Sequence, residues 1–179
     1  MSMSPSLPPN IGTTSLWDFA VATYRCDGVA PACLDLQDIC GVDVPLFLCA
    51  GFAVVQGKRF DKVALNELQQ IAEPWQRDIV AALRAIRRQL KSGPHPAPNA
   101  SSDSLRASVK AAELAAEKIQ LDAMQSAATG LPKSNGSVTL DNVISALTLV
   151  VATSAGGEVP VPQTAQIEMI ARSMLDQLA

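Results

Sequence analysis

The chain has 179 residues, of which 48% are hydrophobic, 17% are charged and 4% are aromatic. A chain of this length can bury roughly two thirds of the surface it exposes when unfolded, so it needs neither a disulfide nor a metal to fold. The net charge of −3 gives no general reason to expect nucleic-acid binding. Alanine and leucine dominate and alternating β-branched residues are scarce, which favours helices over strands.

The N-terminal region predicts a soluble, cytoplasmic protein. Residues 1–14 are rich in proline and serine and are predicted to form a disordered tail. They have neither the basic start nor the apolar stretch of a signal peptide. The longest apolar run, residues 44–55, is shorter than the roughly 20 residues that span a membrane. We therefore expect no membrane span, and cysteines that stay reduced in the cytoplasm.

Three short helices are predicted first. Ser15 has the position of an N-cap for a helix over 16–25, and Asp18 completes a Ser-x-x-Asp capping pattern. Helices over 29–40 and 44–56 follow, and each ends before a glycine. The third helix is apolar on all sides, which predicts that it is buried on every face.

Two further helices are predicted over 62–72 and 74–91. A break is expected between them at Glu73-Pro74, because proline suits the first turn of a helix. One apolar stripe runs along the second of these helices, made of Trp75, Ile79, Leu83, Ile86 and Leu90. Its arginines and Lys91 lie off that stripe.

A long helix over 103–126 has a thin apolar seam in which many residues are small, and it is predicted to dock on a neighbour. The seam residues are Leu105, Val109, Ala112, Ala116, Ile119 and Ala123. Helices over 139–153 and 163–178 complete the chain. Linker-like loops are expected near 92–102, 129–138 and 154–162.

The predicted fold class is therefore all-α. We expect a compact bundle of about seven or eight mostly short helices, with no β-sheet, as a single domain over residues 15–179.

The four cysteines are predicted to pack as small hydrophobic residues. Cys26, Cys33, Cys40 and Cys49 are separated by 7, 7 and 9 residues, whereas structural zinc sites usually pair ligands two to four residues apart. Cys33 and Cys40 are separated by about 10 Å of helix rise, too far for a disulfide. No metal site and no cofactor are predicted from them.

An acidic face is a candidate metal site. Asp35 and Asp38 lie three residues apart on one predicted helix, and Asp43 follows it. Such carboxylates could hold Mg²⁺ if a substrate phosphate or further carboxylates completed the shell. The alternatives are a solvated face, or pairing with the arginine-rich helix.

A basic face on the helix over 74–91 is the candidate partner-binding site, formed by Arg84, Arg87, Arg88 and Lys91. It could meet an acidic protein, phosphate groups or the chain's own carboxylates. No interleaved aromatic residues accompany it, so nucleic acid is not expected.

Four aromatic residues could line a pocket for a small apolar ligand, namely Trp17, Tyr24, Phe47 and Trp75. Filling the core is the alternative for all four.

Few residues point to catalysis. The single histidine, His95, lies in the linker-like stretch GPHPAP, where it is not held as a general base must be. No glycine-rich phosphate loop is present. The leading hypothesis is a non-enzymatic helical interaction or adaptor module that binds a partner through its basic face. The alternatives are a carrier or Mg-dependent enzyme for an apolar or phosphorylated small molecule bound between helices, and a self-associating structural module.

Ordered motifs along residues 15–125 add a resemblance. They are L-W-x-F-A with a following tyrosine (Leu16 to Tyr24), A-C-L-x-L-Q-D (Ala32 to Asp38), D-V-x-L-x-L (Asp43 to Leu48), Pro74-Trp75, L-R-x-x-R-x-x-L-K (Leu83 to Lys91) and V-K-x-x-E-L-x-A-E (Val109 to Glu117). In this pattern the chain resembles an uncharacterised proteobacterial family of conserved hypothetical proteins, a domain of unknown function. The resemblance implies an all-helical protein and supplies no activity, cofactor or catalytic residue.

Overall fold

The computed structural model describes residues 14–177, which fold entirely into helices and their connections. The elements are α1 (Leu16–Tyr24), α2 (Val29–Cys40), α3 (Val44–Val55), α4 (Lys62–Trp75), the π-helix η2 (Gln76–Val80), α5 (Ala81–Gln89), α6 (Ala100–Gly130), α7 (Leu140–Ser154) and α8 (Val161–Asp176). No strand occurs within residues 14–177, so the predicted all-α class is confirmed. Apart from Thr14, the tail predicted for residues 1–14 lies outside the described residues, as does Leu178, the predicted end of the last helix.

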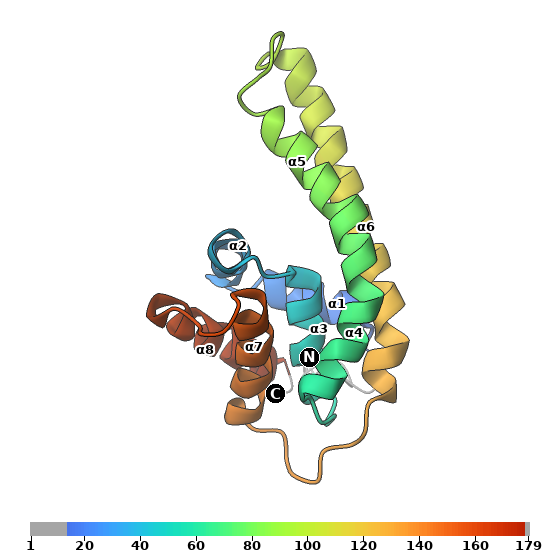
Figure 1. The fold of residues 1–179 in the computed structure, drawn as a ribbon, viewed down its shortest axis with the longest axis vertical. Helices are drawn as coiled ribbons and strands as arrows, with labels where there is room; N and C mark the ends of the chain where they lie inside the picture. Colours follow the sequence, from blue (N-terminus) through green and yellow to red (C-terminus); the bar gives the residue numbers. More distant parts are fainter. Residues whose placement is uncertain (1–13, 178–179) are drawn as a thin grey trace, which may run out of the picture.

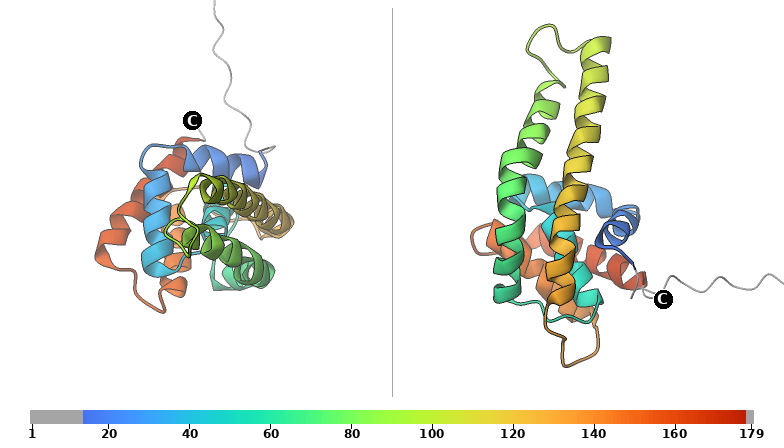
Figure 2. Two further views of the ribbon diagram at one scale, coloured as in Figure 1. Left: turned by 90° about the horizontal axis from the view of Figure 1, so that it is seen from above. Right: turned by 90° about the vertical axis from the view of Figure 1, so that its right-hand side faces the viewer.

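Helix α3 is the centre of the fold. Every one of its residues, from Val44 to Val55, is buried. Helices α1, α4, α6, α7 and α8 all pack against it, and Figures 1 and 2 show them grouped around it. The predicted burial on every side is therefore confirmed, and α3 supplies much of the hydrophobic core.

Local signals place the first helix ends as predicted. The Ser15 hydroxyl accepts a hydrogen bond from the Asp18 backbone N–H at 3.0 Å. Gly41 ends α2 in the left-handed region at φ 69°, a conformation that glycine adopts without steric cost. The chain then turns sharply, and α2 and α3 are bent by 120° relative to each other.

No single helix among residues 14–177 is both long enough and apolar enough to cross a membrane. Helices α2 and α3 pass that test only as a bent pair.

The break predicted at Glu73-Pro74 is wrong. Pro74 lies inside α4, and the helix continues through η2 into α5. Proline cannot donate a backbone hydrogen bond to the preceding turn. The chain continues into a wider turn, in which the Ala81 N–H donates to the Gln76 carbonyl five residues earlier. Residues 62–89 are thus one helical rod, seen in green in Figure 2.

The α5 end of the rod and the first part of α6 project beyond the rest of the molecule as a hairpin (Figures 1 and 2). We define the arm as residues 81–112, which comprise α5, the connecting loop and the first part of α6. No residue of the arm is buried, whereas buried residues of α6 begin at Glu113. The arm therefore contributes nothing to the hydrophobic core.

The cysteines pack as predicted. Cys33, Cys40 and Cys49 are buried in the core, Cys26 is half-buried against it, and all four are free thiols. Burial raises the pKa of Cys33 to about 12, so this thiol stays protonated at neutral pH.

Gly51 lies where α3 and α8 approach each other closely. A Cβ at this position would lie 2.2 Å from the Met174 Sδ, and Met174 is fully buried. Gly51→Ala gains about 1 kcal/mol of helix propensity, but overpacking costs about 1–3 kcal/mol. We expect a net loss of about 1 kcal/mol in the free energy of unfolding, measured by urea denaturation.

The matched control is Gly130→Ala, because nothing lies within 4 Å of a Cβ there. This variant should be neutral or slightly stabilising. The cost of Gly51→Ala should also shrink when Met174 is replaced by alanine in the same chain. Equal costs in both backgrounds would contradict the close approach.

Candidate functional site

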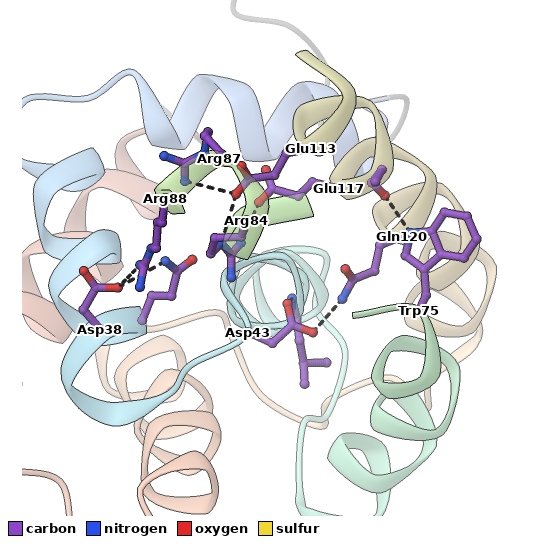
Figure 3. A network of polar contacts seen from close by, with 12 residues as sticks. Asp38, Asp43, Trp75, Arg84, Arg87, Arg88, Glu113, Glu117 and Gln120 are labelled. Atoms are coloured by element: carbon purple, nitrogen blue, oxygen red, sulfur yellow. Dashed lines mark hydrogen bonds and ion pairs between the residues drawn. The ribbon is translucent and has the colours of Figure 1, made fainter. Parts of the chain in front are cut away.

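Polar residues gather where α5 leaves the body and crosses α6 (Figure 3). The Arg84 guanidinium donates from Nε to Glu113 Oε1 and from Nη2 to Glu117 Oε1, both at 2.9 Å. Arg87 donates to both oxygens of Glu113. The side chains of Arg84 and Glu113 are only 12% and 8% exposed, so this is a largely buried ion-pair cluster.

The two glutamates differ in their electrostatics. Burial opposes the charged form of Glu113, but hydrogen bonds from Arg87 and Arg84 outweigh it and hold its pKa below the ordinary value. Burial dominates at Glu117 and raises its pKa, even though Arg84 acts in the opposite direction. Glu113 is therefore the carboxylate to which both arginines are anchored.

Arg88 links the arm to α2. Its Nη2 donates to Asp38 Oδ1 at 2.5 Å, and both side chains are 54% exposed. The hydrogen bond from Arg88 holds the pKa of Asp38 below its usual value. An exposed pair of this kind contributes at most about 1 kcal/mol, so it orients the arm more than it stabilises it.

Asp43 lies at the start of α3, where the Gln120 side chain of α6 reaches it (Figure 3). Its Oδ1 accepts from the Leu46 N–H, and its Oδ2 accepts from Gln120 Nε2 at 2.6 Å. Burial raises the pKa of Asp43 to about 6, and the hydrogen bonds from Leu46 and Gln120 only partly offset it. This carboxyl therefore titrates close to neutrality.

Trp75 fixes the turn from which the arm rises. Its indole Nε1 donates to the Ala116 carbonyl at 2.9 Å. An open hollow of about 230 Å³ lies between α2, η2 and α5, lined by Gln37, Asp38, Gly41, Val42, Gln76, Arg84 and Arg88. The Oε1 atoms of Gln76 and Gln120 are buried without a hydrogen-bond partner among residues 14–177.

The four residues of the predicted basic face differ in their ion-pair partners. Arg84 and Arg87 turn inward to Glu113, and Arg88 pairs with Asp38, whereas Lys91 forms no ion pair within residues 14–177. Their role in partner binding stays a prediction. The apolar stripe of the same helix is only partly its contact face: Trp75, Leu83 and Leu90 are half-buried. Ile79 and Ile86 are 38% and 47% exposed.

The three aspartates of the predicted acidic face have different partners, and metal binding by them stays a prediction. Asp35 accepts a hydrogen bond from Gln166, Asp38 from Arg88 and Asp43 from Gln120, and each partner lies on a different helix. No group of three or more histidine, cysteine or acidic side chains placed to hold a metal occurs within residues 14–177.

None of the four aromatic candidates lines the hollow between α2, η2 and α5, and none lines a second hollow beside the α3–α4 turn. Phe47 is fully buried in the core, and Trp17 and Tyr24 pack partly against it. The ammonium of Lys118 lies 5.6 Å from the Trp17 ring centroid. Ligand binding by these residues also stays a prediction.

Sequence reasoning missed Glu113, Glu117 and Gln120. The predicted seam of α6 is only partly its contact face: Ala116 is buried, but Leu105 and Ile119 are 53% and 52% exposed. A signal was present, because Glu113 and Glu117 are four residues apart on one helix face, opposite arginines with similar spacing.

The fold and this cluster define an all-helical protein with a projecting, charge-anchored arm. The family model described as a protein of unknown function (DUF2390) matches residues 15–124. The chain therefore belongs to this family, which confirms the resemblance to a family of unknown function. The match includes the arm, the cluster and α3 and ends before α7. No curated protein and no solved structure matches the chain.

The buried cluster generates a stability prediction. Glu113→Gln removes the shared carboxylate of two inward-facing arginines, and breaking such a buried pair costs about 3 kcal/mol. Arg84→Met combined with Glu113→Gln should cost less than the sum of the two single changes. The measurement is a double-mutant cycle by urea denaturation.

The control for this cycle is Asp122→Asn, which breaks the exposed pair with Lys118 on the same helix. It should change the free energy of unfolding by less than about 0.5 kcal/mol. If Glu113→Gln were as mild as Asp122→Asn, the buried cluster would not anchor the arm.

Asp43 generates a pH prediction. Because its pKa rises from 3.8 to about 6 on folding, the folded state binds this proton more tightly. The stabilisation is fully present below pH 3.8 and is lost as the pH rises through about 6. It amounts to at most about 3 kcal/mol. Asp43→Asn keeps an N-cap but cannot ionise, so its advantage over the wild type should grow between pH 4 and pH 7.

The matched control is Asp61→Asn at the N-cap of α4. Backbone hydrogen bonds from Ala64 and Val63 lower the pKa of Asp61, so stability from this residue is lost as the pH falls. The two difference curves against the wild type, from urea denaturation at several pH values, should have opposite slopes. A flat curve for Asp43→Asn would contradict the raised pKa.

Proposed function

We propose that this protein acts through binding, and that its arm docks onto an acidic surface of a partner protein. The observation that carries the proposal is the projecting arm itself (Figure 1). It exposes aliphatic and cationic side chains together. A hairpin with no buried residue, held outside the core, is suited to contact with another molecule.

The charge of the arm supports an acidic partner. Residues 89–112 carry Lys91, Arg106 and Lys110 against Asp103, a net charge of 3 − 1 = +2 in a chain whose total is −3. Lys91 and Lys110 are exposed and form no ion pair within residues 14–177. Such cations steer association with an acidic surface and fix its register.

The apolar side chains of the arm support a protein rather than a nucleic acid. Ile86 and Leu105 are 47% and 53% exposed. Residues 81–112 contain no phenylalanine, tyrosine or tryptophan on which a base could stack. Aliphatic side chains rimmed by lysines match the usual plan of a protein interface, an apolar centre with a polar rim.

Two arginines of the basic face are less suited to contact with a partner. Arg84 and Arg87 are engaged by Glu113, so reversing their charge would disturb the fold as well as any interface. The cations that can meet a partner at little cost to the fold are Lys91 and Lys110. We therefore place the contact on the outer part of the arm rather than on the whole basic face.

A photo-crosslinking residue at Leu105 tests the proposal in the native host. We expect one discrete adduct with another protein, whose crosslinked peptide is rich in aspartate and glutamate by mass spectrometry. The same residue at Val63, which is 73% exposed but lies off the arm, should give no such adduct. The adduct should be lost in Lys91→Glu/Lys110→Glu.

The matched control is Lys62→Glu/Lys133→Glu, which changes the net charge equally at exposed positions outside the arm. It should leave the adduct unchanged. A product at twice 18.8 kDa, an adduct with nucleic acid, or no discrete adduct at position 105 would each contradict the proposal.

A further inference from the structure

A second hollow lies at the opposite end of the molecule from the arm, between the α3–α4 turn and the loop that joins α6 to α7. Its volume is about 130 Å³. Two cationic residues, Lys58 and Arg59, line it from the α3–α4 turn. Four uncharged polar residues line it from the other side, namely Ser134, Ser137, Asn142 and Ser145.

Backbone contacts hold the two walls together. The Arg59 N–H donates to the Pro132 carbonyl, and the Ser134 N–H donates to the Gly57 carbonyl, both at 2.8 Å. Lys58 and Lys133 form an antiparallel bridge between the same segments. The hollow is therefore a fixed junction of two chain segments that lie about 75 residues apart in the sequence.

Lys58 is the main charge of this hollow. It is half-buried, and no carboxylate among residues 14–177 pairs with it. Arg59 contacts Asp61 through Nε at 3.1 Å, in a pair that is well exposed. A lysine that is partly removed from water without an ion-pair partner favours the arrival of an anion.

The uncharged residues supply hydrogen-bond donors. The hydroxyls of Ser137 and Ser145 have no hydrogen-bond partner among the described residues. Asn142 accepts the Thr139 hydroxyl on its Oδ1, and its amide N–H groups have no acceptor within residues 14–177. Ammonium, guanidinium, hydroxyl and amide donors on several sides suit the three terminal oxygens of a phosphate group better than the two of a carboxylate.

Apolar side chains form the rest of the lining. Val54, Phe60 and Val138 lie in the same hollow as the donors. Phe60 is half-buried and packs against the core, and it also lines the hollow. An apolar wall beside a cluster of donors suits the organic part of a phosphate ester.

We propose that this hollow binds a phosphate monoester, with Lys58 and Arg59 meeting the phosphate and Phe60 the organic group. The site is separate from the arm. Apart from Lys58, Arg59, Val54 and Phe60, its lining lies beyond residue 124, outside the part that matches the family model.

The test is titration of the full chain with phenyl phosphate, inorganic phosphate and benzoate. Binding is monitored by calorimetry and by the NMR chemical shifts of the backbone amides. We expect phenyl phosphate to bind most tightly and to shift the amides of Gly57, Arg59 and Ser134. Lys58→Gln should weaken phenyl phosphate at least tenfold, and Phe60→Leu should weaken it toward the affinity of inorganic phosphate.

Lys62→Gln is the matched control, because it removes the same charge from an exposed lysine outside the hollow. Its affinity for phenyl phosphate should stay within twofold of the wild type. Unchanged melting temperatures of Lys58→Gln and Phe60→Leu confirm that these variants fold.

Three results would overturn the proposal. They are no binding of phenyl phosphate at millimolar concentration, equal weakening by Lys58→Gln and Lys62→Gln, and tighter binding of benzoate than of phenyl phosphate.

Discussion

The enclosure of α3 is the constraint on which the rest of the structure depends. A helix of twelve apolar residues has no face to present to water, so other helices must cover it on all sides. Its first turn still needs a side chain to accept the free backbone N–H groups, and Asp43 supplies one. Because α6 packs against α3, the Asp43 carboxylate also lies next to α6, and Gln120 donates a second hydrogen bond to it. A routine capping residue becomes a buried carboxyl whose protonation is tied to folding.

The wide turn at η2 determines which side chains of α5 face α6. One extra residue in a helical turn rotates the side chains that follow by about 100°. Without it, Ile79 and Ile86 would follow Trp75 along one face. With it, Val80 is buried and Arg84 meets α6. Helix α5 is consequently attached to α6 by a charge cluster, and Ile79 and Ile86 are left exposed.

Sequence alone placed most of the helices because their ends carry local signals. Ser15, Gly41 and Asp61 each fix a boundary through their own backbone or side chain, independently of the rest of the fold. Pro74 indicates an irregular helix but not the wide turn that follows, which accompanies the contact of Trp75 with the distant Ala116 carbonyl.

The candidate site was less predictable because burial of a charge depends on the alignment of two elements. Arg84 and Glu113 each look like surface residues in the sequence, and only their pairing across two helices explains why both are removed from water. Apolar spacing could not find that face, because its central members are Glu113, Glu117 and Gln120. Lys91, at the end of the same basic run, has no such partner within residues 14–177 and stays outside.

The absence of any residue of the arm from the hydrophobic core has a consequence for its motion. Local opening of a protein segment costs free energy in proportion to the packing that it loses, and residues 89–112, beyond the cluster of Arg84 and Arg87, have little packing to lose. Their backbone amides should exchange with solvent long before those of α3, while the cluster at Glu113 marks the edge of the cooperatively folded unit. The outer hairpin can therefore open locally without unfolding of the body. A contact with the hairpin can reduce this local opening without disturbing the body.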